Sequence, residues 1–381
     1  MDNFTFQNPT KLVFGKDILK NVGKELATSG AKKVLLLAGG GSIRKNGVYD
    51  SVVASLKEAN LEFFEYWGVQ PNPVLSSVND AITEAKHNGV DALLSVGGGS
   101  VIDTTKAVAA GFYIDNVWQA FEEGAYIKKA LPLYTVLTLS ATGSEMNGFA
   151  VITNDSESKK WAIGGPALYP KASFVDPSVQ MSLPWRQTAN GAVDALSHIM
   201  EFYFLGTDEE ANLALNESLM RTVIKVANSL QKNDQDYAAR ANLALSATLA
   251  LNGVAGISLK GGDWSTHALE HSISALHPKV AHGEGLAVMF PAWISYQQKH
   301  NPQLFKRWAS EVWKADNFDS GVIKMKAQYK KWGSPVSLGD LGLTATDIPA
   351  LVENVLLAGR PLGQLNPLKK EDVEAIYKLA L

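Results

Sequence analysis

The chain has 381 residues, of which 46% are hydrophobic and 19% charged, and its formal net charge is −3. At this length a single hydrophobic core usually stops growing, so two domains are expected. The composition is that of a well-packed soluble protein. Without a basic block, it argues against nucleic acid or an anionic membrane as a partner.

The chain contains no cysteine, which excludes disulfides, thiolate catalysis and cysteine-bound zinc. Its first residues, MDNFTFQNPTKLVFG, lack the basic and apolar regions of a signal peptide. No run approaches the roughly 18 apolar residues of a membrane span. We therefore expect a soluble, cytoplasmic protein.

In the first half of the chain, short apolar runs alternate with helical patterns. Strands are predicted at residues 33–38, 61–67, 91–96 and 131–140, and helices at residues 48–60 and 76–89. The turns Gly39-Gly40-Gly41-Ser42 and Gly97-Gly98-Gly99-Ser100 each follow a predicted strand. Repeated strand–turn–helix units indicate a parallel sheet covered by helices.

The second half of the chain has a different character. From about residue 186 the patterns are long and helical, as at residues 212–231 and 241–253, and strand signals nearly vanish. The change follows Pro184. The sequence thus predicts an α/β domain over residues 1–184 and an all-helical domain over residues 185–381.

The two glycine turns favour a bound nucleotide. Glycine lets the backbone approach a phosphate closely, and the amides at a helix N-terminus complement the phosphate charge. Tight turns also need glycine for structural reasons alone, so either turn by itself is weak support. The pattern GxxxxGK[ST] is absent, which argues against ATP-type P-loop chemistry.

The histidines are unevenly distributed. Four of the seven fall within one short stretch, namely His267, His271, His277 and His282. His267 and His271 are four residues apart in a helical pattern, as are Asp194 and His198, so each pair projects from one helix face. An aspartate with imidazoles suits a divalent ion such as iron(II) or zinc. The alternative is a surface hydrogen bond or simple packing, and few sites take five protein ligands.

Taken together, these motifs resemble the iron-containing (group III) alcohol dehydrogenases, in the branch of butanol dehydrogenases and NADPH-dependent aldehyde reductases. The likeness spans nearly the whole chain. It rests on NPTKLVFG at 8–15, both glycine turns, PNP at 71–73, ATGSE at 141–145, Asp176-Pro177, the Asp194/His198 and His267/His271 pairs and HGEG at 282–285. It implies a Rossmann-like, dinucleotide-binding N-terminal domain, an all-α C-terminal domain, the dehydroquinate synthase-like fold, a metal in the cleft between the domains, and a homodimer.

The resemblance also implies the ligands of the metal, which are Asp194, His198, His267 and His282. His271 matches a family histidine on the substrate side of the metal. The interval from His271 to His282 is one residue longer than the family pattern, which keeps His277 open as the fourth ligand. The expected ion is Fe²⁺, with Zn²⁺ or Ni²⁺ as alternatives.

The implied reaction is hydride transfer between nicotinamide C4 and a carbon whose oxygen the metal polarises. His271 is the candidate catalytic residue that relays a proton, since imidazoles ordinarily titrate near neutral pH; orientation or packing are its alternative roles. The apolar residues expected around the histidines favour small to medium primary alcohols and aldehydes as substrates, and they are Trp264, Leu269, Ile273 and Met289.

Cofactor choice depends on the residue that ends the first buried strand, where an acidic side chain would bind the ribose 2′-hydroxyl and repel a 2′-phosphate. Gly39 occupies this place, with Arg44 and Lys45 shortly after it, which favours NADP(H) over NAD. An aspartate in the first turn of a helix, such as Asp103, can instead compensate the helix dipole. The hydroxyls of Thr138, Thr142 and Ser144 can instead belong to an ordinary loop. The expected cofactor-binding residues are Gly39, Gly40, Gly41, Ser42, Lys45, Asn72, Gly97, Gly98, Gly99, Ser100, Asp103, Thr138, Thr142, Ser144 and Lys160.

Two other functions stay open. A glycerol dehydrogenase-like or dehydroquinate synthase-like enzyme would share the fold, although the second would need a cluster of basic residues for its polyanionic substrate. A catalytically silent metal-binding protein is the other alternative. Oxidation of NADPH with a panel of aldehydes separates the three.

Overall fold

The computed structural model describes Met1 and residues 3–381, which form two compact units. The sheet unit comprises residues 7–183 and 234–248, and the helical unit comprises the first residues up to Phe6 with residues 184–233 and 249–381. One limit between the units lies at Pro184, where the sequence changes character. We keep the division at this residue as a proposal for the folding domains.

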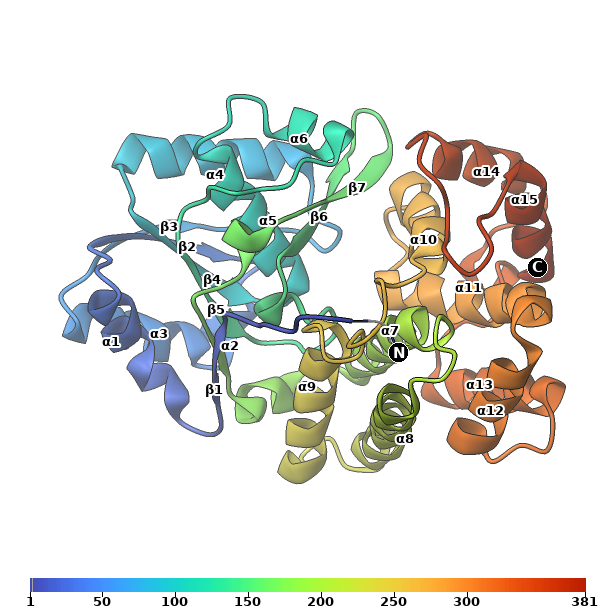
Figure 1. Ribbon diagram of the computed structural model, residues 1–381. Coiled ribbons are helices and arrows are strands. Elements are labelled where there is room, and N and C mark those ends of the chain that lie inside the picture. Colours follow the sequence, from blue (N-terminus) through green and yellow to red (C-terminus); the bar gives the residue numbers. More distant parts are fainter. Residues whose placement is uncertain (2) are drawn as a thin grey trace. The chain divides into compact units, whose positions relative to one another are not determined.

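The sheet unit contains six parallel strands in the order β1-β8-β5-β4-β2-β3 (Figure 1). Their bounds are β1 (Lys11–Phe14), β2 (Lys33–Ala38), β3 (Glu62–Tyr66), β4 (Ala92–Gly97), β5 (Leu133–Leu137) and β8 (Ala172–Val175). A separate antiparallel hairpin pairs β6 (Phe149–Asn154) with β7 (Lys159–Gly164). The predicted fold class, an α/β part with a parallel sheet followed by a helical part, is confirmed.

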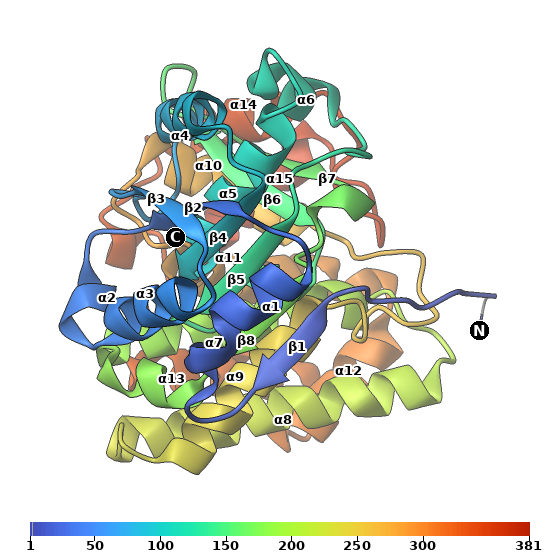
Figure 2. The same cartoon turned by 90° about the vertical axis from the view of Figure 1, so that its left-hand side faces the viewer.

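Apolar residues alternate along the central strands and create two cores. Leu35 and Leu37 of β2 face one core, while Val34 and Leu36 face the other. Helices α4 (Leu75–Asn88), α5 (Gly99–Gly111) and α6 (Val117–Glu123) cover the first core, and α1 (Val22–Thr28) and α3 (Val48–Glu58) the second (Figures 1 and 2). Because both faces are covered, the strands are apolar on both sides, as expected of a parallel sheet.

One helix joins the sheet unit from a later part of the chain. Helix α9 (Tyr237–Leu251) contributes Ala244 to an apolar cluster with Ile102, Leu137 and Val175. Residues 234–248 therefore pack with the sheet unit although they follow Pro184 in the sequence.

The order of the strands places a topological switch between β2 and β4. The chain runs outward from β2 to β3 and then returns to the other side of β2, so the connections after β2 and β4 leave in opposite directions. In open parallel sheets, ligands bind beyond the carboxyl ends of the strands at such a point. Both glycine turns follow these two strands.

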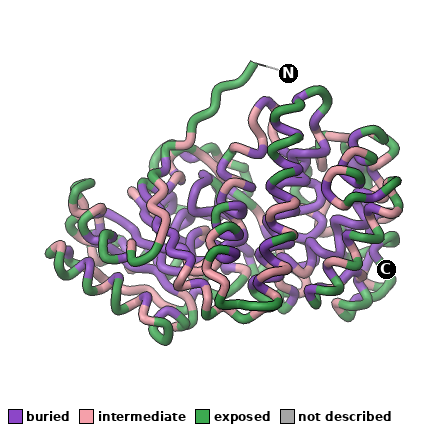
Figure 3. Tube along the Cα trace, turned by 90° about the horizontal axis from the view of Figure 1, so that it is seen from below, coloured by how far each residue is buried: buried purple, intermediate pink, exposed green. Residues whose placement is uncertain are grey.

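The helical unit consists of helices packed on one another. They are α7 (Trp185–Tyr203), α8 (Glu210–Lys232), α10 (Ser265–Leu276), α11 (His282–Gln297), α12 (Pro302–Trp313), α13 (Phe318–Trp332), α14 (Ile348–Leu356) and α15 (Lys370–Leu379). Helix α11 packs against α7, α10 and α15. Buried segments (purple) run through the interior of each unit, with exposed turns around them (Figure 3). Among the described residues, no helix is both long and apolar enough to cross a bilayer.

An aromatic cluster forms part of the helical core. Phe305 of α12 has no exposed surface and stacks on Phe204, with 4.2 Å between the ring centroids, and its ring lies 6.3 Å from that of Trp293. Such rings remove large apolar areas from water and prefer stacked or tilted pairs.

Replacing Phe305 by Ala is therefore expected to lower the free energy of unfolding by about 3–5 kcal/mol, because it removes buried contacts and leaves a cavity. Urea denaturation followed by tryptophan fluorescence measures the change. Ile323→Ala is the control, since Ile323 lies on α13 with 67% of its surface exposed. Equal stability of the two variants would contradict this view of the core.

Candidate functional site

The first glycine turn follows β2 directly and leads into α2 (Ser42–Lys45), a single helical turn. Gly41 has φ of +96°, a conformation that favours glycine, and a Cβ atom at Gly40 would meet nothing within 4 Å. A Cβ atom at Gly39 would lie 3.3 Å from the Val69 carbonyl oxygen. Ser42 and Lys45 are exposed, so backbone and donors at this strand end are accessible.

Arg44, next to Lys45, has partners within the protein. Its guanidinium lies 4.0 Å from the centroid of the Trp67 ring and 3.6 Å from a carboxylate oxygen of Glu65. Glu65 in turn accepts hydrogen bonds from Tyr49 Oη and Trp67 Nε1. Glu65 thus offsets part of the positive charge of Arg44, which we expected to favour the 2′-phosphate of NADP(H).

The second glycine turn is closely packed. The amide of Thr138, just after β5, donates to the carbonyl of Gly97, so the ends of β4 and β5 lie together. A Cβ atom at Gly99 would lie 2.4 Å from the side chain of Thr142. Gly99 is therefore required for packing as well as for any ligand. Gly98 caps α5, and Gly99 and Ser100 begin it, so the amides of this turn stand at the helix N-terminus.

A buried polar network connects α5 to the loop after β5. Ser144 Oγ donates to Asp103 and Lys106 Nζ donates to Ser144 Oγ, over 2.6 and 2.8 Å. Lys106 Nζ also donates to Asn147 Oδ1 and the Phe149 carbonyl. Burial raises the pKa of Asp103 and lowers that of Lys106 to about 8, and each charge opposes the shift of the other. Asp103 and Ser144 hence bind each other in this structure.

Two further expected cofactor residues lie together. Lys160 Nζ of β7 donates to Asn72 Oδ1 over 3.1 Å, although the residues are far apart in sequence. The second strand of the hairpin is thereby tied to the PNP segment, and the Thr153 amide of β6 donates to the Pro73 carbonyl.

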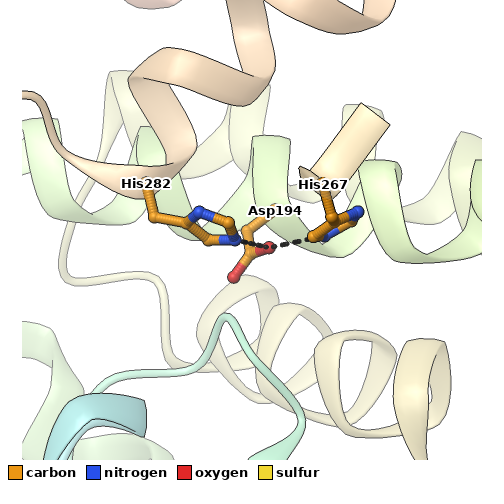
Figure 4. Close-up of side chains that lie close together, drawn as sticks. All are labelled: Asp194, His267 and His282. Carbon is orange, nitrogen blue, oxygen red and sulfur yellow. Dashed lines mark ion pairs between the residues drawn. The ribbon is translucent and has the colours of Figure 1, made fainter. Parts of the chain in front are cut away.

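The expected metal ligands come from three helices of the helical unit. Asp194 and His198 lie on α7, His267 on α10, and His282 is the first residue of α11. The Nε2 atoms of His198, His267 and His282 lie 3.5, 4.0 and 3.6 Å from the same atom, Asp194 Oδ1. Figure 4 shows His267 and His282 on opposite sides of Asp194, with both rings directed at its carboxylate.

These residues fit a divalent ion. Asp194 Oδ1 and His267 Nε2 are buried and have no hydrogen-bond partner among the described residues, an arrangement that costs stability unless another group binds there. Donors at about 2.0–2.2 Å around a tetrahedral ion lie about 3.3–3.6 Å apart, close to the observed separations. Burial lowers the pKa of His198 to about 3, which keeps its imidazole neutral, the form that binds metals.

The two other histidines of the cluster are placed differently. The half-buried His271 ring has its centroid 5.5 Å from that of His282 and 6.4 Å from that of His267. Among the described residues, acidic and histidine donors form two groups within 4.8 Å, Asp194/His267/His282 and Glu270/His271/His282. His277, at the C-terminal end of α10, belongs to neither group. His198 belongs to neither group as well, but its Nε2 atom lies 3.5 Å from Asp194 Oδ1.

Of the four apolar residues expected around the histidines, Trp264 is partly exposed and lies beside two of them. The Trp264 ring lies 5.4 Å from that of His267 and 6.3 Å from that of His198, between centroids. Leu269, Ile273 and Met289 have no exposed surface, so they belong to the core and not to the lining of an open pocket. Helical spacing in the sequence could not distinguish a residue of the core from a residue that lines a pocket.

Sequence reasoning missed two buried carboxylates beside the ligands. Glu201 binds His267 Nδ1 over 2.7 Å, and Glu270 binds His282 Nδ1. Burial raises the pKa of Glu201, while the hydrogen bond from His267 opposes this shift. Each glutamate follows a ligand histidine by three residues in an apolar helical pattern, which was the available signal.

Comparison with known proteins agrees with this geometry. The family model described as iron-containing alcohol dehydrogenase matches residues 9–177, and the model of the C-terminal part of the Fe-containing alcohol dehydrogenase family matches residues 188–381. A crystal structure of NADH-dependent butanol dehydrogenase A from Thermotoga maritima is 49% identical, with a TM-score of 0.97 over 100% of this chain and 99% of that one.

Two curated relatives extend the comparison. NADH-dependent butanol dehydrogenase A from Clostridium acetobutylicum is 36% identical over 99% of both chains. The NADPH-dependent aldehyde reductase from Escherichia coli (strain K12) is 33% identical over 100% of both chains. The chain therefore belongs to the iron-containing alcohol dehydrogenase family.

Proposed function

We propose that the protein is a metal-dependent, NADP(H)-linked alcohol dehydrogenase or aldehyde reductase for small to medium primary alcohols and aldehydes. The observation that supports this most is the convergence of three imidazole Nε2 atoms on one buried oxygen of Asp194. Membership of the family supports it too, as do the relatives that are named butanol dehydrogenase and aldehyde reductase. A cytoplasmic homodimer belongs to the same proposal, and sedimentation equilibrium measures its mass.

The helical unit provides the metal site of this proposal. Asp194, His198, His267 and His282 would hold Fe²⁺, or Zn²⁺ or Ni²⁺ in its place. When bound, a divalent ion supplies Lewis acidity toward an alcohol or aldehyde oxygen. Trp264 provides an apolar wall next to the histidines, which suits an alkyl chain. A ring nitrogen of His271 would take up or deliver the hydroxyl proton, since this ring is half-buried beside two ligands.

The sheet unit would hold the dinucleotide. The turns after β2 and β4 lie at the topological switch, and the α5 amides complement a phosphate. The names of the relatives are divided between NADH and NADPH, so relatedness does not select the cofactor. We base the proposed preference for NADP(H) on Gly39, which leaves the strand end without a carboxylate, and on the exposed Lys45.

Loss of one ligand is expected to remove the metal. Protein purified without oxygen should contain one divalent ion per chain and should oxidise NADPH when an aldehyde such as butanal is added. Asp194→Ala and His267→Ala should lose the ion and nearly all turnover, because one of four donors is gone. Elemental analysis and absorbance at the NADPH band measure both. His300→Ala, at an exposed position, is the control. Normal metal content and rate in either variant would disprove the ligand assignment.

Cofactor preference is expected to depend on charge at residue 39. Gly39→Asp should lower kcat/KM for NADPH by about tenfold or more and spare that for NADH, because like charges would face each other at the 2′-phosphate. Gly39→Asn has nearly the same volume without the charge, so it separates repulsion from crowding against Val69. A wild-type enzyme that prefers NADH outright would contradict the proposal for this turn.

Replacement of His271 is expected to impair proton transfer without loss of the metal. His271→Ala should keep its metal while turnover falls on the order of 10²-fold and its pH dependence changes, as expected for loss of a general acid–base group. Metal analysis and a pH–rate profile measure this. His277→Ala is the matched control, as a half-buried histidine of the same stretch. Metal loss in His271→Ala would make His271 a ligand, and an unchanged profile with full activity would make it structural.

A further inference from the structure

We propose that Glu201 and Glu270 are positioning residues of the metal site. Each carboxylate fixes the Nδ1 atom of one ligand histidine, so that the Nε2 atom of the same ring faces Asp194. This inference rests on the metal site of the proposed function. It adds two buried acids that contact no substrate and act only through the histidines.

Glu201 holds both the side chain and the backbone around His267. It lies on α7 and has no exposed surface. Its Oε1 atom accepts from the His267 amide over 3.1 Å and contacts His267 Nδ1 at 2.7 Å, while its Oε2 atom accepts from the Trp264 amide over 2.7 Å. The Asp263 amide donates to the Glu201 carbonyl. Four contacts thus join one residue of α7 to the segment that begins α10.

The same carboxylate replaces a missing helix cap. Trp264 is the N-cap residue of α10, and its side chain makes no capping hydrogen bond. It also has φ of +60°, which a bulky residue adopts only when its surroundings enforce it. Glu201 satisfies amides at this helix start and holds the strained turn. The position of His267, the third residue of α10, therefore depends on Glu201.

The hydrogen bond at Nδ1 selects one form of the ring. A neutral imidazole carries one proton, and a carboxylate at Nδ1 keeps that proton there, which leaves the Nε2 lone pair for a metal. His267 Nε2 is the atom that lies 4.0 Å from Asp194 Oδ1. The carboxylate also fixes the rotation of the ring.

Glu270 does the same for His282. It lies on α10 with no exposed surface, and one of its oxygens binds His282 Nδ1. A Cβ atom at Gly285 would lie 2.6 Å from Glu270 Cγ, so glycine at this place in the HGEG motif lets α11 approach the carboxylate. His282 Nε2 then faces Asp194 Oδ1 at 3.6 Å.

The third histidine provides an internal contrast. His198 Nδ1 is buried and has no hydrogen-bond partner among the described residues. His198 is placed by its i+4 relation to Asp194 and by stacking on His267, with 4.8 Å between centroids. The two histidines from other helices thus have carboxylates, and the histidine that shares a helix with Asp194 has none.

Metal affinity tests this assignment without relying on turnover. Glu201→Gln and Glu270→Gln are compared with the wild type in competition against a chromophoric chelator for Zn²⁺, and in the visible spectrum of the Co²⁺-loaded protein. We expect each variant to bind Zn²⁺ about 10–100-fold more weakly, with an altered Co²⁺ spectrum, because the ring loses its fixed orientation. Glu217→Gln is the matched control. Glu217 is a buried glutamate of the same unit that binds Tyr203 and Arg307.

The outcomes separate the two proposals. Wild-type protein that binds no metal at its histidines would overturn the proposed function, and this inference with it. Wild-type binding with unchanged affinity and spectrum in both glutamine variants would overturn the inference alone. Equal weakening in Glu217→Gln would also overturn it, since loss of any buried carboxylate would then suffice. If Glu201→Gln does not fold, Glu270→Gln decides, because it leaves the hydrogen bonds of Glu201 to the amides at the start of α10 in place.

Discussion

The arrangement of the helical unit depends on the burial of Asp194 among three imidazoles. A buried carboxylate oxygen without a hydrogen-bond donor is costly, and so is a buried ring nitrogen that faces it. Helices α7, α10 and α11 nevertheless bring these atoms together to within 4.0 Å. A divalent ion at this place would turn an unfavourable set of polar atoms into a favourable one.

In the sheet unit, burial of the strands limits where a ligand can bind. The central strands β2, β4 and β5 are buried, so a ligand can reach their backbone at the strand ends. The glycines after β2 and β4 lie at such ends, beside the switch in strand order. The network of Asp103, Lys106 and Ser144 then fixes the loop after β5 against α5. These three polar residues therefore stabilise the packing of the loop on α5, whether or not they also bind a ligand.

Part of this architecture is visible in the sequence. Apolar runs predicted β2, β3, β4 and β5, whereas the parallel strands β1 and β8 were not predicted. The spacing of Asp194/His198 and His267/His271 predicted the helices α7 and α10. The contacts of Arg44 with Glu65 and Trp67 were not predictable, because they join side chains from different elements. The histidine partners of Glu201 and Glu270 lie 66 and 12 residues away, so the sequence marked the positions of these glutamates but not their partners. Helical periodicity reports which residues are apolar, and it does not report whether they line a pocket or fill a core, as Leu269 and Met289 illustrate.

The distribution of the ligands along the chain has a consequence for stability. Helices α8, α9 and α10 lie between Asp194 and His282 in the chain, yet His282 Nε2 lies 3.6 Å from Asp194 Oδ1. An ion held there joins three helices as a cross-link, and the unfolded chain has no such preformed site. Binding that is restricted to the native state adds RT ln(1 + [M]/Kd) to the free energy of unfolding. The lifetime of the folded chain in a cell would accordingly follow the concentration of free metal, and starvation for that metal would remove protein as well as activity.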